Sequence, residues 1–296
     1  MIFEMENILL TGATGFVGKR FLEYNSEKFN IFPVSFEKWD ETNIEIFKNA
    51  KTIVHSAGIA HRMEKTDPDL YFEVNFRKTK IFADIAKSKG TKHFIFISTI
   101  KAFGEYQNGI LTEASPCKAD NDPYGQSKLL AENYLKSIED GNFIVSIIRP
   151  PLIYGPGVKG NLIKFLELAD TLLPLPFKNV ANRRTMIFLD NFIELINRII
   201  ETKHSGIFLA GDKTPISTEK LISEIRLCLR KESNLFSIPN VLKNMISFVK
   251  PEFALRLFGS LEMDTRNTYE RLNFTPPYSS EFGIKQMVDW YKKKDY

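Results

Sequence analysis

The chain has only two cysteines among its 296 residues, Cys117 and Cys228, and neither sits at the spacing of a metal or redox site. This argues against a disulfide-stapled fold and a structural zinc site, and we expect no metal and a reducing, cytoplasmic setting. No apolar run approaches the roughly 20 residues that span a bilayer. The N-terminal residues also lack the succession of a signal peptide, so we expect no stable membrane insertion.

An excess of one charge is also lacking. Forty Lys and Arg residues oppose 36 Asp and Glu residues, which leaves a formal charge of +4 spread along the chain. This balance argues against a nucleic-acid partner. The segment 236–261 mixes apolar residues with Lys and Arg, but Pro239 and Pro251 break it, and we expect it to pack against the rest of the protein rather than touch a membrane.

The first half of the sequence alternates apolar strand-like runs with helix-like runs. The expected strands are 7–10, 31–36, 52–55, 93–98 and 143–148, with a later strand at 207–210, and the clearest helices are 18–25, 71–89 and 127–139. Strands buried on both faces with helices between them predict an α/β fold, a Rossmann-like doubly wound parallel sheet. Ligands of such sheets bind beyond the carboxyl ends of the strands.

After Pro150 the pattern changes to Pro- and Gly-rich turns followed by mostly helical sequence. We therefore predict a smaller, mostly helical substrate-binding lobe. The dinucleotide-binding domain would comprise residues 1–157, with 185–211 returning to it, and the lobe would comprise 158–184 and 212–296.

A glycine-spaced turn follows the first expected strand and leads into the first expected helix. Gly12 permits the tight turn, Gly15 permits close approach of a pyrophosphate, and Gly18 permits close packing of helix on strand. The N–H groups at the helix start favour phosphate. The pattern predicts a dinucleotide site.

Tyr124 and Lys128 lie four residues apart and share one face of an expected helix. A free phenol has a pKa of roughly 10, too high for proton exchange near neutrality. We expect the Lys128 ammonium, together with an oxidised nicotinamide, to lower the pKa of Tyr124. Thr99, at the end of the fourth strand, offers a hydroxyl to hold the substrate oxygen beside the tyrosine.

These motifs resemble those of the extended short-chain dehydrogenase/reductase family, in the group that acts on nucleotide sugars. The matching stretches are 11–18, 55–58, Asn75, 98–99, 124–128 and 149–157. Further stretches, at 96–101, 149–161, 173–176, 182–184, 260–264 and 290–291, are similar to bacterial enzymes of surface-polysaccharide synthesis, namely UDP-4-keto-6-deoxy-N-acetylhexosamine 4-reductases and UDP-hexose 4-epimerases.

The resemblance implies functional residues, a cofactor and partners. Catalysis would fall to Thr99, Tyr124 and Lys128. The cofactor, NAD or NADP, would be bound by Gly12, Thr14, Gly15, Phe16, Val17, Gly18, Ala57, Gly58, Asn75 and Lys128. The substrate would be a UDP-sugar, and a homodimer is expected.

The resemblance also implies substrate-binding residues in the second lobe. Arg184 falls where the family places an arginine on the nucleotide diphosphate, a role that suits a guanidinium because it can grip two phosphate oxygens. Arg256 is a second candidate. Asn161 opens an expected helix, where it would present backbone donors to the diphosphate or serve as a plain N-cap. His61 and Arg62, in the loop after Gly58, are candidates to face the substrate.

The sequence leaves two choices open. Counting from Gly12, the acidic residue that holds the adenosine ribose in many NAD-binding relatives falls on Phe36. Glu37 nearby favours NAD, whereas Lys38 or Arg20 would accept the phosphate of NADP. The reductase and the epimerase share one catalytic site. A compressed stretch before Asp40, and Leu152 in place of an asparagine typical of the epimerases, favour the reductase. An NADP-sensing regulator or scaffold is a further alternative, disfavoured by the intact Tyr124–Lys128 pair.

Overall fold

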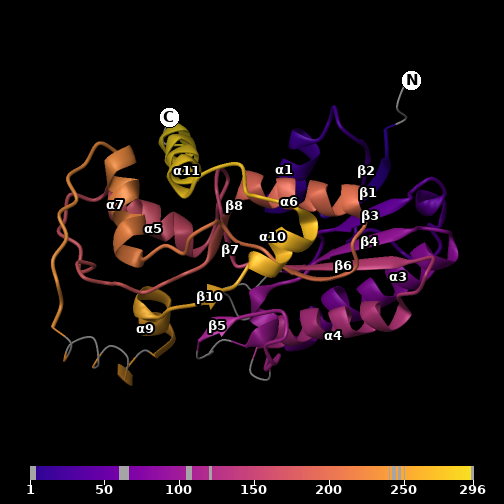
Figure 1. Ribbon diagram of the computed structural model, residues 1–296, viewed down its shortest axis with the longest axis horizontal. Coiled ribbons are helices and arrows are strands. Elements are labelled where there is room, and N and C mark those ends of the chain that lie inside the picture. The colour runs from indigo at the N-terminus through magenta and orange to yellow at the C-terminus, as the bar shows by residue number, and fades with distance from the viewer. Residues whose placement is uncertain are drawn as a thin grey trace.

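A computed structural model describes residues 5–59, 67–104, 109–119, 122–239, 241, 245, 248–249 and 251–294. Its centre is a six-stranded sheet in the order β2-β1-β3-β4-β6-β9 (Figure 1). The strands are β1 Asn7–Thr11, β2 Asn30–Val34, β3 Thr52–His55, β4 His93–Ile97, β6 Ile144–Arg149 and β9 Gly206–Leu209. Every neighbouring pair is parallel, so the prediction of a doubly wound parallel sheet is confirmed.

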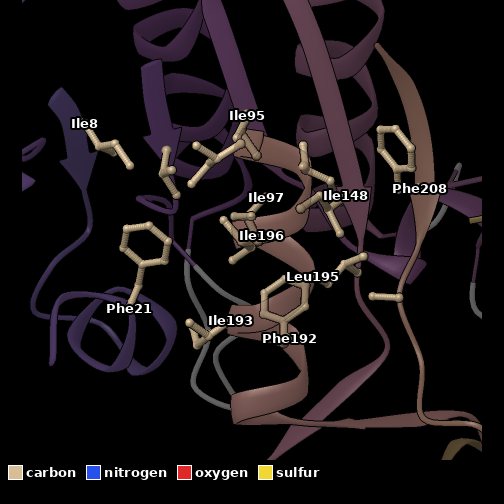
Figure 2. Packing of buried hydrophobic residues seen from close by; sticks show 14 of the residues in the cluster. Ile8, Phe21, Ile95, Ile97, Ile148, Phe192, Ile193, Leu195, Ile196 and Phe208 are labelled. Carbon is tan, nitrogen blue, oxygen red and sulfur yellow. The ribbon is translucent and has the colours of Figure 1, made fainter. Parts of the chain in front are cut away.

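Helices cover both faces of this sheet. In Figure 1, α1 (Phe16–Tyr24) and α6 (Leu189–Thr202) lie above it, and α3 (Thr79–Ser88) and α4 (Pro123–Ile138) lie below it. Figure 2 shows the upper interface, where Phe21 of α1 and Phe192 and Ile196 of α6 face Ile95 and Ile148 of the strands. Burying both faces explains why the strands read as continuous apolar runs.

The order of the strands sets the place of the crevice. From β1 the chain moves to β2 on one side, and β3 then lies on the other side of β1. A ligand crevice opens at such a reversal, beyond the carboxyl ends of β1 and β3. The glycine turn follows β1 directly, and residues 56–58 follow β3.

Three helix boundaries differ from the sequence expectation for local reasons. α1 begins two residues early, at Phe16, so the glycine turn runs straight into it. α4 begins four residues early, because the Asp122 carboxylate accepts the Tyr124 N–H and Pro123 occupies the first helical position. The expected helix 71–89 is divided among α2 (Pro68–Tyr71), the π-helix η2 (Phe72–Lys78) and α3.

The C-terminal part forms a second core. The strands β7 (Leu152–Tyr154) and β8 (Met186–Phe188) pair there, and α5 (Asn161–Asp170), α7 (Thr218–Cys228) and α11 (Ser280–Lys294) pack around them at the left of Figure 1. The core includes Leu162, Phe188, Ile222 and Met287.

Shorter elements complete the structure: η1 Glu45–Phe47, η3 Ile100–Phe103, β5 Ile110–Leu111, α9 Pro251–Phe258, β10 Glu262–Met263 and α10 Arg266–Leu272. The pair β5–β10 ties the C-terminal part to the segment that follows β4. In the part of the chain that the structure describes, no helix combines the length and apolarity needed to cross a bilayer.

Candidate active site

The glycine turn is shaped so that side chains would not fit. Gly12 has φ +75°, and a Cβ there would lie 2.7 Å from the backbone N of Ala57. A Cβ on Gly18 would lie 2.2 Å from the Gly12 carbonyl oxygen. Gly15 caps α1 without a side-chain acceptor for the first-turn N–H groups. The turn thus presents bare backbone and a positive helix end, which suits a pyrophosphate.

The end of β3 and the π-helix form the next wall of the site. The Asn75 side chain is fully buried, accepts the Ile59 N–H at 2.8 Å and donates to the Ile59 carbonyl at 3.0 Å and to Ser127 Oγ at 3.1 Å. A Cβ on Gly58 would lie 2.8 Å from Asn75 Oδ1. Asn75 therefore fastens the loop after β3 to α4, and the wide π turn sets its position.

Thr99 and Tyr124 meet across two elements. Thr99 follows β4 and caps η3, where its Oγ1 accepts the Lys101 N–H. Tyr124 lies in the first turn of α4, and its side chain is hydrogen-bonded to Thr99. The Lys101 ammonium pairs with Asp122 at 2.7 Å, which links the segment after β4 to the start of α4. The expected hydroxyl–phenol pair is therefore present.

Lys128 lies one turn further along α4 and is 4% exposed. Its Nζ is 4.2 Å from the centre of the Phe96 ring, and a Cβ on Gly58 would be 3.5 Å from that nitrogen. Burial lowers the pKa of Lys128 to about 7, although Glu132 acts to raise it. A lysine of this kind exchanges its proton near neutrality.

The expected lowering of the pKa of Tyr124 is not what the structure gives. Burial raises the pKa of this phenol to about 12, although the hydrogen bond with Thr99 acts to lower it. Because burial disfavours phenolate and ammonium alike, Lys128 does not supply the fixed positive charge that the sequence argument assumed. In this state Tyr124 is a proton donor.

A buried ion pair supports these residues, and sequence reasoning missed it. The Glu132 carboxylate accepts from Arg149 Nε at 3.0 Å and Nη2 at 2.5 Å, and also from the Ser98 hydroxyl. It therefore joins α4, β6 and the residue before Thr99. The available clue was the position of Glu132, four residues after Lys128 on the same helix face.

His55 is a second buried group that the sequence argument passed over. Its ring nitrogens contact Thr11 Oγ1 at 2.9 Å and Thr79 Oγ1 at 3.1 Å, which connects β1, β3 and α3. Burial is the larger cause that holds the pKa of His55 well below its usual value, and the charge of the nearby Lys128 is the smaller cause. His55 is thus neutral and holds the ends of β1 and β3 to the start of α3.

The residues predicted to bind the nucleotide diphosphate lie in the C-terminal part of the chain. Arg184 Nη1 donates to the carbonyls of Leu255 at 3.3 Å and Gly259 at 3.0 Å, so this guanidinium holds the end of α9. Asn161 is the first residue of α5 and is exposed, but Gly160 is the N-cap, so the plain N-cap interpretation is wrong. Arg256 lies in α9, but its side chain, like His61 and Arg62, is outside the described residues.

The residues after β2 bear on the choice between NAD and NADP. Phe36 is buried, with its ring edge-on to His55 at 4.7 Å between centroids, so the position counted from Gly12 belongs to the core. Arg20 is held by Asp190 through two hydrogen bonds of 2.7 and 2.8 Å. Glu37 and Lys38 are exposed. Arg20 is therefore already paired, which weakens it as the acceptor of a ribose phosphate.

Comparison with known proteins identifies the family. A sequence profile described as the NAD dependent epimerase/dehydratase family matches residues 8–211, more than half of the chain. The chain belongs to this family. As a member, it is an enzyme that uses a nicotinamide dinucleotide, and the cradle described above fits that cofactor.

Individual relatives of this chain are named as sugar epimerases and a reductase. A Vibrio cholerae UDP-glucose 4-epimerase is 33% identical over 95% of this chain and 94% of its own length. The Escherichia coli O157:H7 N-acetyl-alpha-D-glucosaminyl-diphospho-ditrans,octacis-undecaprenol 4-epimerase is 26% identical over 79% of this chain and 76% of its own length. A Pseudomonas aeruginosa UDP-2-acetamido-2,6-beta-L-arabino-hexul-4-ose reductase is 26% identical over 67% of this chain and 50% of its own length.

The solved structures agree on the fold. The UDP-glucuronic acid 4-epimerase from Bacillus cereus, solved in complex with NAD, superposes with a TM-score of 0.76 over 98% of this chain and 100% of its own. Its sequence identity to this chain is 19%, so this likeness establishes the fold alone.

Proposed function

We propose that this enzyme interconverts the C4 epimers of a UDP-hexose or UDP-N-acetylhexosamine. The observation that carries the proposal is the hydrogen-bonded Thr99–Tyr124 pair with Lys128 buried one turn along the same helix. A hydroxyl, a phenol and a titratable ammonium at one place form a proton-handling site for a carbinol or carbonyl oxygen.

Each residue has a distinct task in this proposal. Tyr124 would take the proton from the sugar C4 hydroxyl only as phenolate, a form that a charged Lys128 and a bound oxidised nicotinamide favour, and would later return it. Thr99 hydrogen-bonds the same oxygen and holds it beside the phenol. Lys128 exchanges a proton near neutrality and favours phenolate when it is charged. A bound nicotinamide dinucleotide supplies the chemistry of hydride removal and return, and the bare backbone of Gly12, Gly15 and the first turn of α1 would hold its pyrophosphate.

The substrate lobe would hold the nucleotide diphosphate. We assign this to Arg184, with Arg256 and Asn161 as further candidates. Arg184→Lys keeps the charge but loses the planar fork, so we expect KM for the UDP-sugar to rise by about tenfold while kcat changes little. Arg183→Lys is the matched control, because Arg183 is exposed and paired with Glu262. Equal KM values for the two variants would rule out the assignment.

The epimerase is preferred to the reductase because the relative that covers 95% of this chain at 33% identity is a 4-epimerase. The second candidate, reduction of a UDP-4-keto-6-deoxy-N-acetylhexosamine, is favoured by two separate features. The connection from β2 to β3, which includes the stretch before Asp40, contains only the short turn η1 among its described elements. Leu152, where an asparagine is typical of the epimerases, lies in β7 and is 43% exposed.

One experiment separates the two. The purified protein is incubated with UDP-glucose and with UDP-N-acetylglucosamine without added cofactor, and the sugar is followed by NMR. Appearance of the galacto epimer establishes the epimerase. Oxidation of added NADH or NADPH by the 4-keto-6-deoxy sugar, without epimerisation of the first pair, establishes the reductase and reports the cofactor preference. Light scattering on the same sample tests the expected homodimer.

A further inference from the structure

A fully buried arginine organises one edge of the substrate lobe. Arg226 of α7 is 1% exposed, and its guanidinium donates to five backbone carbonyls, those of Ala169, Thr171, Leu173, Glu232 and Asn234. The first three acceptors follow or end α5, and the last two follow α7. Arg226 therefore fixes two loops side by side, and neither the cofactor cradle nor the catalytic residues use it.

The two loops carry apolar side chains outward. Leu172 is 85% exposed and Leu173 is 65% exposed, both in the loop after α5. Phe236, in the loop after α7, is 45% exposed. Its N–H donates to the Leu175 carbonyl at 2.9 Å, which keeps the loops in register. These apolar side chains are held in place but are not buried, so they do not stabilise the fold. An ordered, exposed apolar surface of this kind suggests a docking surface.

Further exposed apolar side chains follow Pro239. Val241, Met245, Phe248 and Val249 are each helical, and in the sequence they are spaced at i, i+4, i+7 and i+8, the spacing of one apolar helix face. Their exposed fractions are 75%, 59%, 89% and 69%. The sequence-based expectation that this segment packs against the lobe is therefore wrong for these four side chains. We name the apolar edge by its members: Leu172, Leu173, Phe236, Val241, Met245, Phe248 and Val249.

The charged residues beside the apolar edge are mostly positive, which favours an anionic partner. Between Ser233 and Pro251 the sequence has no Asp or Glu and has two lysines, Lys243 and Lys250. Lys178 and Arg230 in the adjoining loops are exposed, against one exposed carboxylate, Glu232. Two copies of this edge face to face would bring like charges together, whereas an anionic lipid surface would attract them.

We propose that the apolar edge docks this enzyme on the surface of an anionic lipid bilayer. The apolar side chains insert among the acyl chains near the headgroups, and the exposed Lys178 and Arg230 side chains contact the anionic headgroups. The proposal concerns a surface rather than the catalytic residues and does not depend on which sugar is the substrate.

Vesicle sedimentation with the full chain tests the proposal. We expect binding to phosphatidylcholine vesicles that contain phosphatidylglycerol, weak binding to phosphatidylcholine alone, and release by high salt. The variant Phe248→Ser/Val249→Ser should bind at least about tenfold more weakly, because two large apolar groups no longer enter the bilayer. Leu172→Ser/Leu173→Ser tests the loops independently.

The matched control is Phe32→Ser, which removes a 49% exposed phenylalanine from the edge strand β2. It should bind vesicles like the parent protein, and turnover of the soluble sugar nucleotide should survive in all three variants. Equal vesicle binding by the parent and both edge variants overturns the proposal. Absence of vesicle binding by the parent protein also overturns it. If, in addition, the parent is a dimer and Phe248→Ser/Val249→Ser is a monomer, the apolar edge contacts a second copy of the chain instead.

Discussion

Two groups at the start of α4, the Tyr124 phenol and the Lys128 ammonium, are both pushed away from their charged forms by burial. Desolvation acts on each group separately and is the largest cause of each shift. The proton therefore stays on Tyr124, while Lys128 is divided between its two forms near neutrality. At the scale of single residues, we expect protonation of Lys128 to set the reactivity of the proposed site.

Removing the phenolic hydroxyl tests the role of Tyr124. Tyr124→Phe keeps the ring, including its neighbour Tyr71 at 6.1 Å between centroids, and loses only the proton-transfer group. We expect kcat to fall by about 10²- to 10⁴-fold, with cofactor affinity preserved. Turnover by the sugar NMR assay and cofactor binding by calorimetry are the two measurements. Normal turnover would refute the assignment and would reopen the regulator or scaffold alternative.

The Glu132 carboxylate offers a second residue-scale test, because its charge acts to raise the pKa of Lys128. Glu132→Gln should lower that pKa further and move the pH profile of kcat/KM to lower pH. Loss of the carboxylate also leaves Arg149 buried and unpaired, which costs on the order of 3–5 kcal/mol of stability.

A second variant keeps that experiment interpretable. Glu132→Gln/Arg149→Met removes both charges and should recover part of the lost stability while the shifted pH profile remains. The control is Glu45→Gln, whose side chain is 79% exposed. If stability falls but the pH profile stays in place, Glu132 is a structural residue only.

At the scale of elements, the junction of β1 and α1 depends on three positions without side chains. The closest approach is at Gly18, where a Cβ would lie 2.2 Å from the Gly12 carbonyl oxygen. The turn must open to accept even one methyl group, and the opening moves the N–H groups that face the pyrophosphate. Helix placement and cofactor binding are therefore coupled.

Gly18→Ala should weaken cofactor binding by at least about tenfold, because overpacking of this kind costs about 1–3 kcal/mol. The dissociation constants of NAD and NADP, measured by titrating each cofactor into the protein and following its intrinsic fluorescence, report the effect. Gly141→Ala is the control, since no atom lies within 4 Å of a Cβ built there. Identical affinities for both variants would mean that the turn does not hold the cofactor.

For the whole molecule, the buried Lys128 makes the free energy of unfolding depend on pH. Its pKa is about 7 when folded, against an ordinary value of 10.5. Between these pH values the unfolded chain binds a proton that the folded protein does not, so the free energy of unfolding rises with pH in this window and levels off above it. Below about pH 7 both states are protonated, and this dependence disappears.

We therefore expect stability to increase by about 2 kcal/mol between pH 7 and pH 9 from this residue. Urea unfolding at the two pH values measures the change, and Lys128→Met should lack it. A parent protein with the same pH slope as Lys128→Met would show that the lysine is charged when folded.

The sequence by itself determined the sheet and the steric constraints of the glycine turn, and it predicts the catalytic set. Strands such as β4 are apolar after the first residue, and glycine spacing has a direct steric meaning, so local pattern is sufficient. The spacing of Tyr124 and Lys128 likewise needs only the geometry of one helix.

Only the tertiary structure decided the electrostatics and the exposed surface. The direction of the Tyr124 pKa shift depends on how much protein covers the phenol, and the Glu132–Arg149 pair joins a helix to a strand 17 residues away. The role of Arg226 could not be predicted from the sequence either, because its acceptors are backbone carbonyls of two separate loops. Burial and long-range pairing are properties of the assembled chain, whereas periodicity and turn chemistry are properties of short segments.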